Sequence, residues 1–295
     1  MPPLRWLITG ASGQLGGHVL RQLSEEPRRH AILGLAGRGV VGPSVPVRHI
    51  DLADADALRA CVADFRPTHV MHLGAMTAVG ACFAEPARAE AINTIATRVL
   101  AQSAAEIGAR LLFSSTDMVF DGTAAPYSEA DPPQPLSHYA RTKVAAEQAL
   151  TAFSNTLIVR IPLLYGLPSS RRETTFVQQI AALRHGQPLR LFTDEFRTPV
   201  WLADAARALV VLARSDLTGL IHVAGPERLS RYDMILVCAK LLGSAQPNLI
   251  RASRLDSAAS EPRPADLSLN GGRFDRLFPD LKPGPLRAEA LATTR

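Results

Sequence analysis

The stretch WLITGASGQLG, residues 6–16, passes from an apolar run through three glycines into a helix-like segment. Glycine at these positions allows a tight turn and a close approach of the backbone to a ligand. The amide groups and the positive end of the following helix favour a pyrophosphate. The Gly-x-x-Gly-x-x-Gly pattern between strand and helix therefore predicts a dinucleotide site. Its expected contacts are Gly10, Ser12, Gly13, Gln14, Leu15 and Gly16.

The first 165 residues alternate short apolar runs with segments of helical periodicity, which predicts βαβ units. The expected strands are 5–9, 31–36, 47–50, 69–73, 110–114 and 157–160. The expected helices are 16–25, 55–65, 86–107 and 137–153. This alternation predicts an α/β fold with a doubly wound, Rossmann-type parallel sheet. Because ligands bind at the carboxyl ends of such strands, the expected cofactor contacts include Leu52, Gly74, Ala75 and Ile161.

The pattern is looser after residue 166. Helices are expected at 176–184, 202–213 and 232–242, and strands at 189–192 and 220–223. We expect residues 1–165 to form a dinucleotide-binding domain to which 199–225 return. Residues 166–198 and 226–295 are expected to form a smaller C-terminal substrate-binding lobe.

The composition excludes several classes of protein. The 295 residues are 47% hydrophobic and carry a net charge of +5, but the arginines are dispersed and few aromatic side chains accompany them. A dinucleotide or another small polyanion accounts for that bias better than nucleic acid does. No apolar run reaches the roughly 20 residues of a membrane span, and no signal peptide is evident, so we expect a cytoplasmic protein. The three cysteines show no metal or disulfide spacing.

The second and third strands point to the nature of the dinucleotide. Arg38 stands where an NAD-binding fold would place an acidic residue, and a guanidinium there can hold the 2′-phosphate of NADP. NADP(H) is therefore the expected cofactor, with NAD(H) as the alternative; a solvated loop arginine is the structural alternative. Asp51 follows the third strand and is expected either to contact adenine or to cap a helix.

Tyr139 and Lys143 are spaced to share one face of a helix. A phenol transfers protons poorly at neutral pH, and a nearby ammonium lowers its pKa. Lys143 is also expected to hold the nicotinamide ribose. Thr116 ends the fifth strand and is the hydroxyl expected to polarise a substrate carbonyl. A surface Tyr–Lys pair and a capping cluster of hydroxyls remain the structural alternatives.

In this order the motifs resemble the extended short-chain dehydrogenase/reductase superfamily, and within it the dTDP-4-dehydrorhamnose reductase-like branch. The motifs that carry the resemblance are GQLG at 13–16, STDMVFDG at 115–122, YARTK at 139–143, RTPVWLAD at 197–204 and RP at 263–264. The resemblance implies a catalytic set of Thr116, Tyr139 and Lys143, with Asn93 as a water-organising residue. It also implies hydride transfer from NADPH to a keto carbon while Tyr139 supplies the proton.

The chain departs from that branch where the sugar should lie. Met118 replaces a tyrosine and Leu163 replaces a tryptophan, and both are expected substrate contacts. The stretch RIPLLYG at 160–166 resembles the regulatory β subunits of methionine adenosyltransferase instead. Further expected substrate contacts, through a diphosphate, are Arg171, Arg172 and Arg197, each of which could equally be a solvated surface residue. The superfamily also implies a homodimer through the helices of Asn93 and Tyr139.

Three functions follow from these observations. The sequence favours NADPH-dependent reduction of a keto group on a nucleotide-linked deoxy-sugar or a similar carbonyl substrate. An NADP-binding regulatory subunit without turnover is the second hypothesis. Sugar-nucleotide epimerase or dehydratase chemistry is the third, because Asp117 follows Thr116 directly.

Overall fold

The computed structural model describes residues 3–25, 30–37, 39, 45–169, 173–244 and 246–292. Three of the arginines predicted to bind ligands, Arg38, Arg171 and Arg172, lie outside these residues. Within the described ranges, no helix combines the length and the apolar content needed to cross a lipid bilayer.

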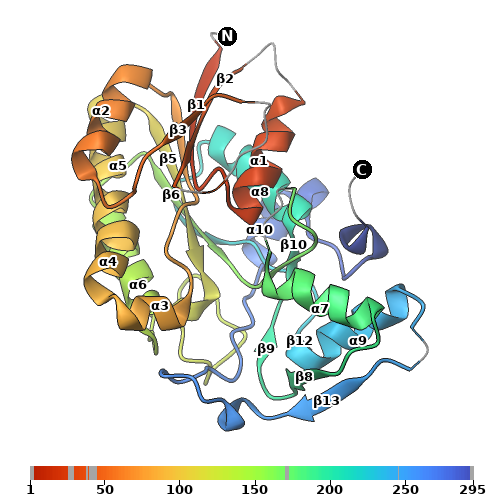
Figure 1. Cartoon of the computed structure of the whole chain (residues 1–295). Coiled ribbons are helices and arrows are strands. Elements are labelled where there is room, and N and C mark those ends of the chain that lie inside the picture. Colours follow the sequence, from red (N-terminus) through yellow and green to blue (C-terminus); the bar gives the residue numbers. More distant parts are fainter. Residues whose placement is uncertain are drawn as a thin grey trace.

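A seven-stranded parallel sheet runs through the larger part of the molecule in the order β11-β6-β5-β4-β1-β2-β3 (Figure 1). Its strands are β1 (Leu4–Thr9), β2 (His30–Ala36), β3 (Val47–His49), β4 (His69–His72), β5 (Arg110–Thr116), β6 (Thr156–Ile161) and β11 (Gly219–His222). Strand order reverses direction between β1 and β4, and an open parallel sheet binds ligands at such a reversal. The predicted doubly wound sheet and its six N-terminal strands are confirmed.

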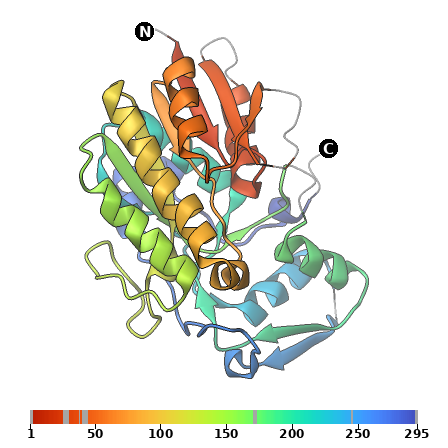
Figure 2. The same ribbon diagram turned by 60° about the vertical axis from the view of Figure 1, so that its left-hand side comes forward.

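Helices cover both faces of the sheet because side chains alternate along each strand. Trp6 and Ile8 of β1 pack with α1 (Gln14–Ser24) and α8 (Leu202–Arg214) on one face. Leu7 faces the opposite core, which α2 (Ala55–Phe65), α5 (Ala96–Glu106) and α6 (His138–Leu150) complete. Figure 2 shows α5 and α6 side by side over that second face. All six residues of β6 are buried, as a central parallel strand requires.

The predicted helix 86–107 is wrong as a continuous α-helix. It consists of α4 (Pro86–Glu90), a π-helical turn (Ala91–Ile95) and α5, and an unpredicted helix, α3 (Val79–Ala84), precedes it. Within the wide turn, the carbonyl of Asn93 accepts a hydrogen bond from the Thr97 hydroxyl at 2.6 Å. A π-turn of this kind commonly marks a functional position and leaves no trace in the apolar periodicity.

A smaller lobe lies beside the sheet, where α7 (Thr175–Arg184) and α9 (Arg231–Leu241) pack against two parallel strands, β8 (Leu189–Phe192) and β13 (Leu249–Ala252) (Figure 1). Short strand pairs join the two parts: β7 (Leu164–Tyr165) with β10 (Val200–Trp201), and β9 (Phe196–Arg197) with β12 (Leu229–Ser230). The sequence missed these four strands, β13 and α10 (Gly272–Leu277), because two to six residues carry too little periodicity. The chain returns to the large sheet at β11, which pairs with β6.

Candidate active site

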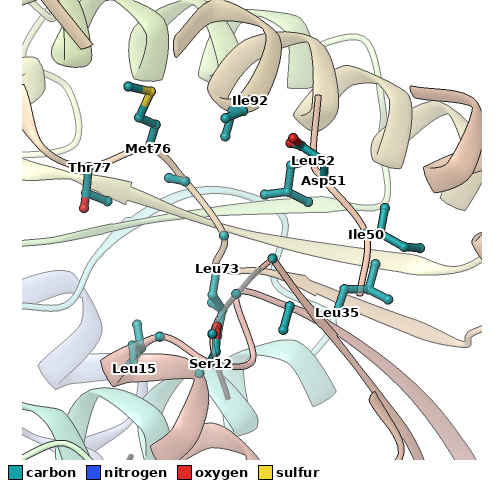
Figure 3. A pocket seen from close by; sticks show the side chains of 18 of the residues that line it. Ser12, Leu15, Leu35, Ile50, Asp51, Leu52, Leu73, Met76, Thr77 and Ile92 are labelled. Carbon is teal, nitrogen blue, oxygen red and sulfur yellow. The ribbon is translucent and has the colours of Figure 1, made fainter. Parts of the chain in front are cut away.

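A cavity of about 1020 Å³ opens at the carboxyl ends of β1 and β4. Its size is at the upper end for a small-molecule pocket. Figure 3 shows Ser12 and Leu15 on one side and Asp51, Leu52 and Ile92 across from them. The predicted cofactor contacts that line it are Gly10, Ser12, Gly13, Gln14, Leu15, Gly16, Asp51, Leu52, Gly74 and Ala75. Tyr139, Lys143 and Ile161 are not among the lining residues.

Backbone contacts shape the glycine turn. Gly10 has φ +68°, and a Cβ on it would lie 2.7 Å from the amide nitrogen of Gly74, so the ends of β1 and β4 touch at these two glycines. A Cβ on Gly16 would lie 2.1 Å from the Gly10 carbonyl oxygen. Gly13 precedes α1 without a side-chain cap, so the first-turn amides face the cavity end of the helix as a phosphate site requires.

We expect Gly16→Ala to weaken NADPH binding by at least about tenfold, because the methyl group would displace the turn that holds the amides in place. The clash is with backbone, so no side-chain movement relieves it. Fluorescence titration with NADPH measures the effect. Gly80→Ala is the control, since a Cβ there meets no atom within 4 Å. Unchanged affinity in Gly16→Ala would contradict this account of the turn.

Asp51 and Arg88 form an ion pair of 2.9 Å at the far end of the cavity. Both side chains are about half exposed, and Asp51 comes from the loop after β3 while Arg88 comes from α4. The Leu52 side chain packs closely on Gly74. A Cβ added to Gly74 would lie 2.7 Å from Cδ1 of Leu52. An adenine in this end of the cavity would therefore meet one apolar wall and one charged edge.

Tyr139 lies at the N-terminal end of α6 and is 8% exposed. Its ring belongs to a buried cluster with Cys82 and Ala89, against which Met76 packs, and Met76 also lines the cavity. Burial raises the pKa of the phenol well above its usual value; the charge of Asp117 raises it further, and the Thr116 hydroxyl opposes the rise through a hydrogen bond. A phenol in this setting is a neutral proton donor. The expected lowering of its pKa by the lysine is not what the structure shows.

Lys143 is 2% exposed, and its Nζ donates to the Ser114 carbonyl at 2.7 Å. The ammonium also lies 3.9 Å from the centre of the Phe113 ring. Burial lowers the pKa of Lys143 to about 7, against the opposing charge of Glu147. The lysine therefore changes charge near neutral pH.

Asn93 is buried in the π-helical turn, and its side chain ties three segments together. Its amide accepts from the Met76 backbone N–H at 2.8 Å, and donates to the Met76 carbonyl and to Thr142, each at 3.0 Å. Asn93 therefore ties the backbone of Met76, which lines the cavity, to the helix that carries Tyr139. The backbone carbonyl of Asn93 accepts the hydrogen bond from the Thr97 hydroxyl.

Asp117 and Arg197 connect the end of β5 to the smaller lobe. Asp117 is 4% exposed, and its Oδ2 lies 3.2 Å from Nε of Arg197. Burial raises the pKa of Asp117, which the Arg197 guanidinium opposes. Arg197 also lies 3.6 Å from Glu195, a fully buried carboxylate that accepts from Arg231 at 2.7 Å and from Arg263 at 2.8 Å.

The remaining predicted residues lie near this network. Thr116 is buried at the end of β5, where it pairs with Ile161 and donates to Asp117 at 3.1 Å. Met118 follows in a 3₁₀ turn and packs near Tyr139, whereas Leu163 packs against the core of the smaller lobe. Arg197 is held by protein carboxylates instead of projecting freely. Sequence reasoning missed Met76, Glu195 and Glu147; of these, only Glu147 carried a signal, four residues after Lys143.

Comparisons with known proteins agree with this architecture. The RmlD substrate binding domain family matches residues 4–281. A dTDP-4-dehydrorhamnose reductase from Streptomyces griseus is 38% identical over 222 residues, covering 74% of this chain and 68% of the relative. Methionine adenosyltransferase 2 subunit beta from Xenopus tropicalis is 28% identical over 292 residues, covering 94% and 83%.

A solved structure extends the likeness to the whole fold. The dTDP-4-dehydrorhamnose reductase from Bacillus anthracis, in complex with NADP, has 26% identity and a TM-score of 0.80, covering 98% of this chain and 97% of that one. The predicted resemblance to this branch of the extended short-chain dehydrogenase/reductases is confirmed. The chain therefore belongs to the RmlD substrate binding domain family.

Proposed function

We propose that this protein reduces a keto group of a nucleotide-linked deoxy-sugar, or a similar carbonyl compound, with NADPH. The observation that carries the proposal is the buried phenol of Tyr139, which burial keeps neutral and whose cluster packs against Met76, a residue that lines the dinucleotide-sized cavity. The chain is an NAD(P)-dependent oxidoreductase, in keeping with its family and its reductase relatives. What is proposed is the substrate and the role of each residue.

The cavity fits a dinucleotide. The glycine cradle of Gly10 and Gly16 leaves room for phosphates where a Cβ would collide with backbone, and the α1 amides point to the same place. The NADP of the Bacillus anthracis reductase supports NADP(H) as the cofactor, with NAD(H) as the alternative. Asp51, Leu52 and Ala75 would hold the adenosine end, and Lys143 the nicotinamide ribose.

When bound, the cofactor supplies a hydride to the keto carbon. Thr116 turns its hydroxyl from Asp117 to the substrate oxygen and so orients the carbonyl. Tyr139 transfers its phenolic proton to that oxygen as negative charge develops there. The Lys143 ammonium stabilises the phenolate that remains. Asn93 keeps Met76 in place against the cluster of Tyr139.

The smaller lobe is proposed to bind the rest of the substrate. In this division, residues 1–165 and 199–225 hold the cofactor, and 166–198 and 226–295 hold the substrate. Met118 is the proposed contact to the sugar from the 3₁₀ turn after β5, and Leu163 the contact from the loop after β6. Arg197 acts through Asp117, since its guanidinium is already held by two carboxylates.

The test follows the loss of NADPH absorbance when purified protein meets enzymatically generated dTDP-4-keto-6-deoxy sugar. Turnover supports the proposal. NADPH binding without turnover of this or related keto-sugars would contradict it and favour a regulatory role, the role implied by the relatives named methionine adenosyltransferase 2 subunit beta. Cofactor that stays bound through purification and is recycled would favour an epimerase or a dehydratase.

A further inference from the structure

Tyr139, Lys143 and Glu147 stand four residues apart along one face of α6, and all three are buried. Glu147 lies one turn beyond the lysine, and both of its carboxylate oxygens are bonded to Arg160, so the proposed reaction gives it no contact with cofactor or substrate. We infer that Glu147, clamped by Arg160, is a positioning residue that keeps Lys143 in its ammonium form. This inference rests on the proposed function, because it assigns the lysine a role in NADPH binding and proton supply.

The clamp is bidentate. Nε of Arg160 donates to Oε1 of Glu147 at 3.0 Å, and Nη2 donates to Oε2 at 2.7 Å. The two side chains are 3% and 8% exposed. Arg160 comes from β6, where its guanidinium also lies 5.0 Å from the Phe120 ring and 3.5 Å from His222. A carboxylate held by two parallel bonds keeps one orientation and one distance to the next turn of its helix.

A purely structural role explains this pair poorly. Burying an ion pair costs desolvation, and apolar side chains of similar size commonly stabilise a core as well or better. The same helix already buries apolar side chains, among them Ala146 and Leu150. The electrostatic effect of the Glu147 carboxylate on Lys143 explains the buried charge better.

The surroundings of Lys143 leave Glu147 as its anionic partner within the described part of the chain. From β5 the lysine meets the neutral Ser114 carbonyl and the Phe113 ring. From β4 it faces His72, which burial keeps neutral by lowering its pKa to about 3. On α6 itself, Tyr139 is a neutral phenol one turn before the lysine. The carboxylate of Glu147 is the group that opposes the burial of the ammonium.

The direction of the effect follows from the charge. Lys143 acts when protonated, so its function is lost as pH rises through its pKa, which is about 7. Removing the negative charge of Glu147 lowers that pKa further. NADPH binding and turnover should then fail at a lower pH than in the unmodified protein, with no change at acid pH, where the lysine stays protonated in both.

The test measures the NADPH dissociation constant by fluorescence from about pH 5 to pH 9 in Glu147→Gln, which keeps the shape of the side chain. We expect the alkaline loss of affinity to move down by about one pH unit, so that binding on the alkaline side is roughly tenfold weaker. The double variant Glu147→Met/Arg160→Met removes the pair without leaving an unpaired charge, and should shift the pH dependence in the same direction by a smaller amount, because the Arg160 cation is removed as well; this holds even if Glu147→Gln does not fold.

Two controls separate this effect from a loss of structure. Asp204→Asn removes another buried carboxylate, paired with Arg287 at 2.6 Å, from α8 on the opposite face of the sheet; it should lower stability without moving the pH dependence. Lys143→Met should abolish the alkaline loss of affinity. If that loss persists in Lys143→Met, or if Glu147→Gln and the double variant change only thermal stability, the inference is wrong.

The binding readout needs no substrate, so the two proposals fail separately. A shifted pH dependence of binding without keto-sugar turnover would overturn the proposed function and support the role of Glu147. Keto-sugar turnover with an unshifted pH dependence of NADPH binding would support the proposed function and overturn the role of Glu147.

Discussion

Replacing Tyr139 with phenylalanine is expected to lower kcat for keto-sugar reduction by about 10²–10⁴-fold, the range lost with a general acid. The phenyl ring keeps the packing against Cys82, Ala89 and Met76, so the fold and NADPH affinity should be unchanged. The variant loses the proton donor and the hydrogen bond to Thr116. Steady-state NADPH oxidation measures kcat, and fluorescence titration measures cofactor binding in the same preparation.

Tyr232→Phe is the matched control, because Tyr232 is a partly buried tyrosine on α9 that stacks under Arg251 at 4.5 Å. It should retain the kcat of the parent protein. Equal turnover in Tyr139→Phe and the parent would show that the proton comes from another group, with Asp117 the nearest acid of raised pKa. A drop in NADPH affinity alone would assign Tyr139 to cofactor binding instead of proton transfer.

The second large effect is expected at Glu195, a fully buried carboxylate in contact with three arginines. Glu195→Gln would remove the negative charge while Arg197 stays buried, and breaking a buried pair in this way costs about 3–5 kcal/mol. Because Arg231 and Arg263 are partly exposed, water offsets some of their loss, and we expect about 3 kcal/mol in the free energy of unfolding. Urea titration measures it.

Asp256→Asn is the control for this change. Asp256 pairs with Arg190 at 3.4 Å on the surface, both side chains more than half exposed, so its loss should shift stability by no more than about 0.5 kcal/mol. Equal losses of stability in Glu195→Gln and Asp256→Asn would show that the buried network around Glu195 does not stabilise the fold.

The network also predicts a dependence on acid pH. Burial alone would raise the pKa of Glu195, but Arg231, Arg197 and Arg263 together hold it below the usual value. The stabilisation by this group is therefore complete above the unfolded pKa of roughly 4.3 and is lost as pH falls through the lower, folded value. Glu195→Gln should flatten that part of the stability profile.

Much of the cofactor side of the site was predictable because it depends on local chemistry. A glycine turn between strand and helix restricts the backbone to few conformations, and all six of its predicted contacts line the cavity. The spacing of Tyr139 and Lys143 put them on one helix face, as found. In both cases the residues are close in sequence, so their spacing along the chain predicts how they lie in the structure.

The substrate side was less predictable because its contacts cross the chain. Asp117, Glu195, Arg231 and Arg263 lie in four separate segments, and their meeting depends on how β9, β12 and the C-terminal residues fold over β5. Arg197 was predicted to bind phosphate, but burial beside two carboxylates gives it protein partners. Strands of two residues carry no period from which these contacts could be inferred.

The amino-acid sequence by itself determined the six N-terminal strands of the large sheet, the glycine turn and the face of α6 that carries Tyr139 and Lys143, since each is set by neighbours within one or two helical turns. Only the tertiary structure decided the charge states. Burial, which depends on the whole fold, raises the pKa of the phenol and lowers that of the lysine to about 7. Long-range packing likewise placed Arg160 against Glu147, behind the lysine whose charge it helps to maintain.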